Sequence, residues 1–356
     1  MLPRALDAPT GGCRYDRRIV EGLRERGWHC TVLRLDDSFP RPHRAALAEA
    51  DARLAALPAG STVIADGLAF GAMPALAARH AARLRWVALV HHPLGLETGL
   101  DDAEAQRHLD EERAALAAAR RVVVTSEATA VELGRLGMRA GQVTHGAPNA
   151  PNMQDARAAK SAGGAATPVV IEPGCEGPCL PGAASRTQAP PMPTRLPRAP
   201  AAPAAPAAPA ACGSPDAPLQ LLCVASVTPR KGHAVLLEAL APLAGRPWLL
   251  HNVGSRALDA AAAGEVQALA ARLGLAAQVR WHDAVEADAL AAWYRRADLF
   301  VLPSWYEGYG MVVGEALAHG LPIVATATGQ APRLLADGAG RVVAPGDVAA
   351  LRAALA

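Results

Sequence analysis

The sequence predicts an α/β protein made of two doubly wound domains, each a parallel sheet with helices on both faces. Short apolar runs alternate with helical patterns from end to end, which is the order that parallel sheets and their crossover helices produce. The chain has 356 residues, too many for one ordinary domain. A stretch rich in Pro and Ala, residues 178–218, separates two such series of elements.

The first series predicts a domain over residues 1–177. Its expected strands are residues 30–35, 62–65, 86–90, 122–125 and 169–171. Residues 17–26 read as an amphipathic helix, because Ile19, Val20 and Leu23 share one face. Residues 139–167 are small, polar and without periodicity, and we expect a disordered surface insertion there.

The start of this domain looks incomplete. A doubly wound domain normally begins with a central strand that leads into its first glycine turn. Only ten residues precede Gly11-Gly12, and they are not convincingly apolar. At the other end, the chain stops in what reads as the first turns of a helix. We therefore expect that the chain is trimmed, that its start is misplaced, or that the fold is incomplete.

The second series predicts a domain over residues 219–356. Its expected strands are residues 219–225, 248–253, 279–281, 299–303, 322–325 and 341–343. Between the domains, Ala-Pro-Ala-Ala-Pro repeats around residues 199–211 favour extended polyproline II, so residues 178–218 are predicted to be a flexible or semi-rigid linker.

Composition excludes several classes of function. A formal charge of +2 with 19% charged residues argues against nucleic acid as the main partner. The six cysteines form no CxxC pair and no cluster of zinc spacing, so we expect free thiols in a reducing compartment and no metal. No signal core or apolar run of about 18 residues occurs. A cytoplasmic location is the expectation.

Glu307 and Glu315 carry the strongest functional signal. They flank a glycine-rich turn between an apolar run and a helical pattern, an arrangement that leaves backbone N–H groups free to bind an anion. A helical rise of ~1.5 Å per residue puts the carboxylates at most about 12 Å apart, which suits two sugar rings flanking a diphosphate. The alternative is that Glu307 caps the helix and Glu315 lies on its solvated face.

Three further features support a ligand site. Arg230 and Lys231 follow the strand at 219–225, where they would face a phosphate or be ordinary exposed loop cations. Gly11-Gly12 forms a predicted turn before a helix and would let backbone approach a ligand, although such pairs are common in turns. His91 follows a strand, where it could hold a sugar hydroxyl or simply bond a loop carbonyl.

Together these motifs resemble the retaining glycosyltransferases of family 4, glycosyl transferases group 1. That family has the GT-B fold, in which two Rossmann-like domains face a cleft. The resemblance rests on Gly11-Gly12, His91, residues 228–233 and the segment from Glu307 to Glu315, and residues 297–304 and 344–347 support it.

The resemblance implies a role for each motif residue. Glu307 would contact the donor sugar near its anomeric carbon, Glu315 the ribose hydroxyls, and His91 the transferred sugar. The residues that would bind the sugar or the diphosphate of the donor are Gly11, Gly12, Arg230, Lys231, Gly308, Tyr309 and Gly310. Retention would follow from attack on the leaving-group face, with phosphate helping to deprotonate the acceptor. Lys231 and helix dipoles would replace a metal.

The implied donor is a UDP- or GDP-linked sugar, with no other cofactor, and the acceptor is a saccharide, a lipid or a small molecule. Five arginines on the first helix could contact anionic lipid, although a solvated helix face is the alternative: Arg14, Arg17, Arg18, Arg24 and Arg26. Ser226 stands where many family members carry Arg, and His282-Asp283 where a glycine is usual. A degenerate, donor-binding relative and a nucleotide-sugar epimerase are therefore the alternative functions.

Overall fold

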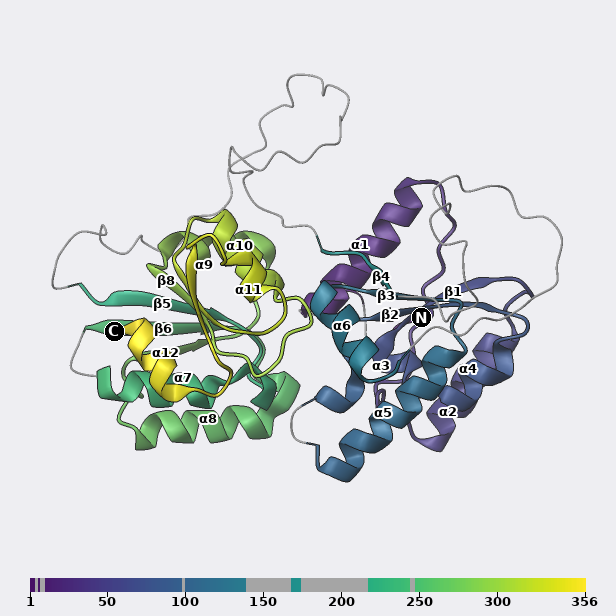
Figure 1. Cartoon of the computed structure of the whole chain (residues 1–356), viewed down its shortest axis with the longest axis horizontal. Helices are drawn as coiled ribbons and strands as arrows, with labels where there is room; N and C mark the ends of the chain where they lie inside the picture. The colour runs from purple at the N-terminus through teal and green to yellow at the C-terminus, as the bar shows by residue number, and fades with distance from the viewer. Residues whose placement is uncertain (4–5, 7–9, 98–99, 139–167, 174–216, 244–246) are drawn as a thin grey trace, which may run out of the picture.

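The computed structural model describes residues 1–3, 6, 10–97, 100–138, 168–173, 217–243 and 247–356, which form two lobes side by side (Figure 1). Each lobe is built on one parallel sheet, with strand orders β1-β2-β3-β4 and β10-β9-β8-β5-β6-β7. The predicted α/β class is confirmed. The predicted insertion at 139–167 and residues 178–216 of the predicted linker lie outside the described residues.

The N-terminal lobe contains four of its five predicted strands. They are β1 (Thr62–Asp66), β2 (Arg85–Val90), β3 (Arg121–Val124) and β4 (Val169–Val170). Its helices are α1 (Gly11–Glu25), α2 (Arg44–Ala55), α3 (Gly67–Phe70), α4 (Pro74–His80), the short η1 (Leu94–Leu96), α5 (Asp102–Ala117) and α6 (Glu127–Arg135). With few aromatic residues in the chain, Trp86 and Phe70 fill the centre of the core and alanines pack around them.

The predicted strand at 30–35 is wrong, because it makes a single parallel bridge from Arg34 to Leu2. Leu2 N donates to Leu33 O at 2.9 Å, and Leu35 N donates to Leu2 O at 2.8 Å. On the other side, Asp66 N donates to Met1 O at 3.1 Å. Met1 and Leu2 thus lie between residues 33–35 and β1.

Helix α1 is only partly buried. Tyr15 and Asp16 are the buried residues on it, whereas the apolar face predicted from Ile19, Val20 and Leu23 stays half-buried. The expected glycine turn also needs correction. Gly11 and Gly12 are the first two residues of α1 itself, after Thr10, whose hydroxyl accepts from Cys13 N at 3.2 Å.

The C-terminal lobe contains all six predicted strands. They are β5 (Leu219–Val224), β6 (Trp248–Val253), β7 (Val279–His282), β8 (Leu299–Leu302), β9 (Ile323–Thr326) and β10 (Gly340–Val343). Helices α7 (His233–Leu240), α8 (Ala260–Arg272) and α12 (Val348–Leu355) cover one face, and α9 (Ala287–Arg296), α10 (Met311–Ala318) and α11 (Ala331–Leu334) cover the other (Figure 1). The 3-10 helices are η2 (Pro229–Lys231), η3 (Ala241–Leu243) and η4 (Ala257–Asp259).

The strand order of this lobe predicts where a ligand crevice would lie. From β5 the chain first moves outward to β6 and β7, then returns to β8 on the other side of β5. In open parallel sheets such a reversal opens a crevice at the carboxyl ends of the two strands. The loops that leave β5 and β8 there carry Arg230, Lys231 and Glu307.

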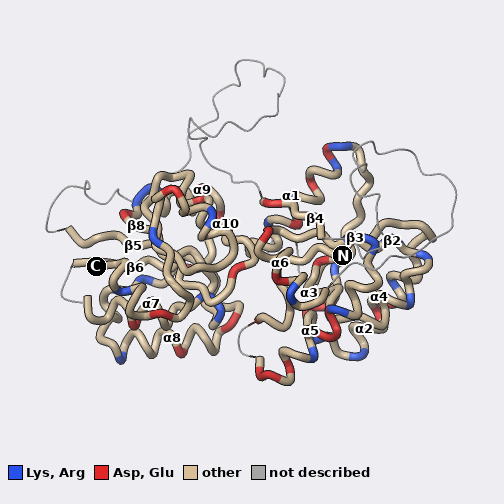
Figure 2. Tube along the Cα trace, in the orientation of Figure 1, with Lys and Arg blue, Asp and Glu red and all other residues tan. Residues whose placement is uncertain are grey.

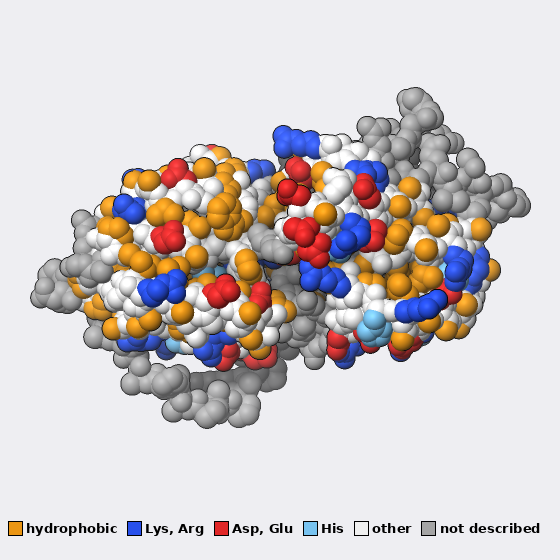
Figure 3. Space-filling view, turned by 90° about the horizontal axis from the view of Figure 1, so that it is seen from below, with side chains coloured by type: hydrophobic (Ala, Val, Ile, Leu, Met, Phe, Trp, Pro, Cys, Tyr) orange, Lys and Arg blue, Asp and Glu red, His pale blue; other side chains and the backbone are white. Residues whose placement is uncertain are grey.

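Charges of both signs are spread over the two lobes. Figure 2 shows acidic and basic positions on both lobes where they face each other. On the face drawn in Figure 3, acidic and basic side chains alternate with apolar ones. Among the described residues, no helix is both long and apolar enough to cross a membrane. Among the described cysteines, Cys30 and Cys223 are free thiols, and Cys223 is buried.

Candidate active site

The loop after β5 lies against the end of β8 because of one glycine. Gly232 adopts a φ of +67° between η2 and α7, and an added Cβ would lie 2.1 Å from Pro303 O. A side chain there would clash with backbone, so only glycine permits this approach. The close approach brings Lys231 beside Glu307, although 76 positions separate them.

Glu307 is buried and surrounded by donors. Its Oε1 accepts from Lys231 Nζ and from Ser304 Oγ, both at 2.6 Å. Arg230 NH1 lies 3.8 Å from Oε2. Burial raises the pKa of Glu307, but the charges of Lys231 and Arg230 outweigh burial and hold that pKa below its usual value. The carboxylate is therefore ionised and held rigidly at the crevice.

Arg230 ties the two lobes together. Its Nε donates to Glu97 Oε1 at 3.0 Å, and its NH1 donates to the Tyr306 carbonyl at 2.9 Å. Glu97 is also bonded to His92 Nε2 at 2.8 Å. Burial raises the pKa of Glu97, but the bond to His92 and the charge of Arg230 lower it to about 2. Sequence reasoning missed Glu97, which follows η1 in the other lobe.

The glycine loop after Glu307 docks on the N-terminal lobe. Ser126 Oγ and Thr129 Oγ1 donate to Gly308 O at 2.5 and 3.3 Å. A Cβ on Gly308 would lie 2.0 Å from His91 O. Further along, Gly310 has a φ of +83° and is the N-cap of α10, and Tyr309 O accepts from Gln330 N at 2.9 Å. The predicted donor loop therefore lies at the junction of the lobes.

Glu315 lies on α10 at the same junction. Tyr294 OH donates to its Oε2 at 2.9 Å, and Arg14 NH1 lies 2.9 Å from its Oε1. The Arg14 contact is ionic but not aligned as a hydrogen bond, so the buried Oε1 lacks a hydrogen-bond partner. A small hollow borders this carboxylate, lined by Arg14, Ala287, Leu290, Ala291, Tyr294, Glu315 and His319.

His91 follows β2 and meets two carboxylates that sequence reasoning missed. Its Nε2 lies 3.0 Å from Asp16 Oδ1 and 3.5 Å from Asp66 Oδ2. The ligand-type atoms of these three residues lie within 4.8 Å of one another, and no other group of three among the described residues does so. Asp66 could have been found from the sequence, because it directly follows the strand predicted at residues 62–65, as His91 follows the strand predicted at 86–90.

The glycines of α1 complete the junction. A Cβ on Gly12 would lie 3.5 Å from the His91 ring, and one on Gly11 would lie 3.9 Å from Met311 Sδ. Gly11, Gly12 and His91 thus face the start of α10. The predicted site residues come together at the junction of the two lobes, and they are joined there by Arg14, Asp16, Asp66, Glu97, Ser126, Thr129 and Ser304.

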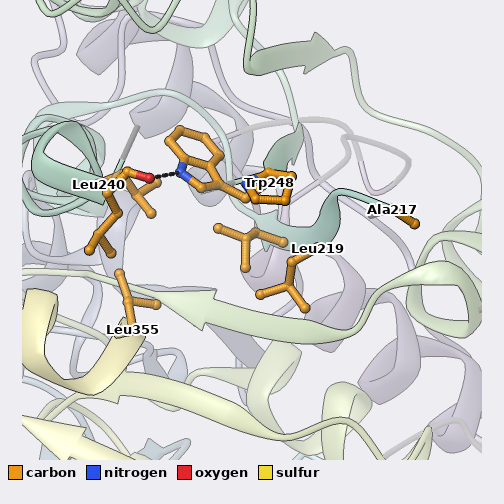
Figure 4. A pocket seen from close by; sticks show the side chains of 8 residues that line it. Ala217, Leu219, Leu240, Trp248 and Leu355 are labelled. Atoms are coloured by element: carbon orange, nitrogen blue, oxygen red, sulfur yellow. Dashed lines mark hydrogen bonds between the residues drawn. The ribbon is translucent and has the colours of Figure 1, made fainter. Parts of the chain in front are cut away.

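A larger cavity lies away from this crevice. It measures about 370 Å³ and is lined by Leu219, Leu221, Leu240, Trp248 and Leu355, among others (Figure 4). Leu219 and Trp248 begin β5 and β6, so the cavity lies at the amino ends of these strands. Trp248 Nε1 donates to Leu243 O at 2.9 Å on its wall. Apolar side chains dominate this lining.

Comparisons with known proteins find similar sequences and similar folds. Residues 218–356 match the family model of glycosyl transferases group 1. A D-inositol 3-phosphate glycosyltransferase of Streptomyces griseus is 39% identical over 141 residues, or 38% of this chain and 30% of that protein. Another from Catenulispora acidiphila is 40% identical over 152 residues, or 40% of this chain and 35% of that protein. The chain therefore matches about a third of the length of these curated relatives.

Two solved structures resemble the whole chain. Sucrose-phosphate synthase from Thermosynechococcus elongatus superposes with a TM-score of 0.67 at 20% identity, over 99% of this chain and 88% of that chain. HepE from Anabaena, in complex with UDP and glucose, superposes with a TM-score of 0.61 at 17% identity, over 99% and 87%. These similarities confirm the predicted fold, with two Rossmann-like domains of the GT-B type.

Proposed function

We propose that this chain, whose residues 218–356 match the family model of glycosyl transferases group 1, transfers a sugar from a nucleotide-diphosphate sugar to a hydroxyl acceptor, retaining the anomeric configuration and without a metal ion. The observation that carries the proposal is Glu315 Oε1, buried at the crevice without a hydrogen-bond partner. Buried polar atoms rarely stay unsatisfied, and a ribose hydroxyl is a donor of the right kind. In this proposal, Glu315 binds the ribose.

The diphosphate would lie between the ribose and the sugar, where Lys231 and Arg230 supply positive charge. Helix α10 begins beside them, and its first N–H groups favour an anion. Gly308, Tyr309 and Gly310 would add backbone N–H groups. Such fixed charges and dipoles can neutralise a leaving diphosphate, which is the role a divalent ion plays elsewhere. This reasoning supports metal independence.

Retention is proposed from the state of Glu307. Its Oε1 already accepts from Lys231 and Ser304, so this carboxylate is better placed to hold a sugar hydroxyl than to attack carbon. The acceptor hydroxyl would attack from the leaving-group face and lose its proton to a phosphate oxygen. His91, across the junction, would contact the transferred sugar.

We propose UDP as the nucleotide before GDP, since HepE, a neighbour of the same fold, was solved with UDP-glucose. The acceptor could be a saccharide, a lipid or a small molecule, and D-inositol 3-phosphate is the first compound to test, given the names of the curated relatives. For a lipid-linked acceptor, the exposed end of α1 with Arg24, Arg26 and Trp28 (61% exposed) is the proposed membrane contact. Free thiols favour a cytoplasmic location.

A second candidate is an inactive relative that binds the donor without transferring its sugar. The exposure of α1 favours this reading, because only Tyr15 and Asp16 are buried on the helix that carries Gly11, Gly12 and Arg14 into the site. An unstable α1 would impair closure of the crevice while leaving the C-terminal lobe able to bind a nucleotide.

Calorimetric titration with UDP, GDP and ADP tests the proposal, alongside Glu315→Ala. We expect one nucleotide to bind the native chain and to lose at least about tenfold in affinity in the variant, since a charge-assisted hydrogen bond contributes about 1.5–3 kcal/mol. An assay for turnover of the corresponding nucleotide-sugar in the presence of EDTA then distinguishes an active transferase from an inactive relative. If Glu315→Ala binds the nucleotide as tightly as the native chain, then Glu315 does not bind the ribose.

A further inference from the structure

Three ionisable side chains from separate elements meet beside the crevice in the N-terminal lobe. Asp16 comes from α1, Asp66 from the end of β1, and His91 from the residue after β2. Asp16 and Asp66 are 3% and 5% exposed. Burying two carboxylates is costly unless they are paired, so the cluster needs a compensating charge. His91 supplies it.

Both carboxylates address the same ring nitrogen. His91 Nε2 lies 3.0 Å from Asp16 Oδ1 and 3.5 Å from Asp66 Oδ2. Asp66 is itself held in place, because its Oδ1 accepts from Leu68 N at 2.7 Å and caps α3. Two carboxylates therefore hold the ring at Nε2, and one of them, Asp66, is itself fixed by its bond to Leu68.

The electrostatics favour a cationic ring. Burial lowers the pKa of His91, but the hydrogen bonds and charges of Asp16 and Asp66 outweigh burial and raise the pKa to about 10. Two other groups face the cluster. The Tyr15 ring packs edge-on against the His91 ring, with 5.5 Å between the ring centroids. The buried amino group of Met1 interacts with both carboxylates. Burial also raises the pKa of Asp16, to about 6, against the opposing effect of His91.

The other ring nitrogen is left available. Nδ1 of His91 makes no hydrogen bond within the described part of the chain, and the side chain keeps 16% of its surface exposed. The ring touches Gly12, and the His91 carbonyl lies against Gly308 of the proposed donor loop. A cationic ring with one N–H engaged and the other open is suited to donate to a ligand oxygen.

We propose that Asp16 and Asp66 are positioning residues for sugar transfer: they lock Nε2 of His91 and keep the ring protonated, so that Nδ1–H is presented to an oxygen of the donor. The identity of that ligand rests on the proposed function. The locked, protonated ring does not, and it can be measured separately. Ionisable clusters beside a crevice are frequent at functional sites.

The lobe offers a matched control. His80 on α4 and Asp51 on α2 also form an imidazole–carboxylate contact, with Nε2 and Oδ1 at 2.7 Å, which is partly buried and is shared with Arg79. Asp51→Asn therefore breaks the same kind of pair without touching His91. Asp16→Asn and Asp66→Asn remove one charge each and keep the shape of the side chain.

The first experiment follows the ring nitrogens of His91 by NMR on the native chain labelled with ¹⁵N-histidine, using His91→Gln for assignment. We expect both nitrogens to stay protonated from pH 6 to about 9, and the midpoint to fall by at least about one pH unit in Asp16→Asn. Asp51→Asn should not move it. A neutral His91 ring at pH 7.5 in the native chain would overturn the proposal, even if a variant fails to fold.

The second experiment measures kinetics. We expect Asp16→Asn and Asp66→Asn to lower kcat about 10- to 100-fold with little change in donor KM, and to shift the alkaline limb of the pH profile to lower pH. Variants that lose only thermal stability would make the pair merely structural. Displacement of the ring protons by added Zn²⁺, or loss of activity in EDTA, would make the cluster a metal site instead.

The two experiments separate two kinds of failure. If no donor is turned over but His91 stays protonated and responds to Asp16→Asn, then the proposed transfer is wrong and the locked ring stands. If transfer occurs but the ring is neutral, then the transfer stands and the positioning role of the two carboxylates is wrong.

Discussion

Arg14 NH1 of α1 lies 2.9 Å from Glu315 Oε1 of α10, so the N-terminal lobe places a guanidinium on the carboxylate that we assign to the ribose. The pair joins the two lobes. Because the contact lacks hydrogen-bond alignment, Glu315 gains charge compensation without satisfying its oxygen. A ribose hydroxyl would satisfy that oxygen but would have to displace Arg14.

Arg14→Met should therefore tighten nucleotide binding. The Arg14 side chain is 32% exposed, and ion pairs near the surface contribute at most about 1 kcal/mol, which corresponds to a gain of up to about fivefold in affinity. Calorimetry at low salt measures this gain, and Arg17→Met, in the same helix, is the control. Weaker binding by Arg14→Met would show instead that Arg14 itself contacts the nucleotide.

Lys231→Met should lower both turnover and stability. The substitution leaves Glu307 buried without its closest cation, which typically costs about 3–5 kcal/mol of folding free energy. Adding Glu307→Gln removes the uncompensated charge. We expect the double variant to recover most of the lost stability in denaturant titrations but none of the sugar transfer. Recovery of transfer would contradict the assigned role of Lys231.

Gly308→Ala should prevent the lobes from closing. The added Cβ would lie 2.0 Å from His91 O, so the two backbones would have to separate. We expect a larger radius of gyration in small-angle scattering and a loss of kcat, with nucleotide binding to the C-terminal lobe preserved.

Gly264→Ala is the matched control for this prediction. Gly264 lies in α8, and an added Cβ there meets nothing within 4 Å. This control should stabilise the helix by about 1 kcal/mol. If the lobes of the Gly308→Ala variant close, and if it transfers sugar as fast as the Gly264→Ala variant, then the docking of the glycine loop is not needed for transfer.

Glu112→Gln should change how stability depends on pH. Glu112 is fully buried on α5; its Oε2 accepts from Leu94 N at 2.8 Å, and its Oε1 has no partner. Burial raises its pKa from 4.5 to about 8. Between these values the native state keeps a proton that the unfolded chain has lost, so stability falls as pH rises, by up to about 1.4 kcal/mol per unit.

Glutamine cannot lose a proton, so this contribution disappears in the variant. We expect Glu112→Gln to be no more stable than the native chain at pH 5 but clearly more stable at pH 8. Denaturant titrations at several pH values measure both curves. Parallel curves would mean that Glu112 stays charged in the folded chain.

The sequence predicted most strands because their signal is local. A buried parallel strand needs a short apolar run between turn residues, and β5 to β10 each carry one. The motif residues Arg230, Lys231, Glu307 and Glu315 could be found for the same reason, since they stand directly after β5 and β8 or on the helix that follows. The prediction failed at residues 30–35, where the apolar run exists but forms only one parallel bridge, from Arg34 to Leu2.

What the sequence by itself determined is the order of elements, the α/β class and the residues at the strand ends, all of which depend on neighbours in the chain. Only the tertiary structure decided which of those residues are paired. In the sequence, Arg14 is one of five arginines on a helix with a predicted solvated face, and Asp16 was not singled out. Folding brings His91, 75 positions away, to Asp16, and Glu315 to Arg14. Such charge pairs produce no periodic pattern in the sequence, because the spatial positions of separate strands and helices determine which charges meet.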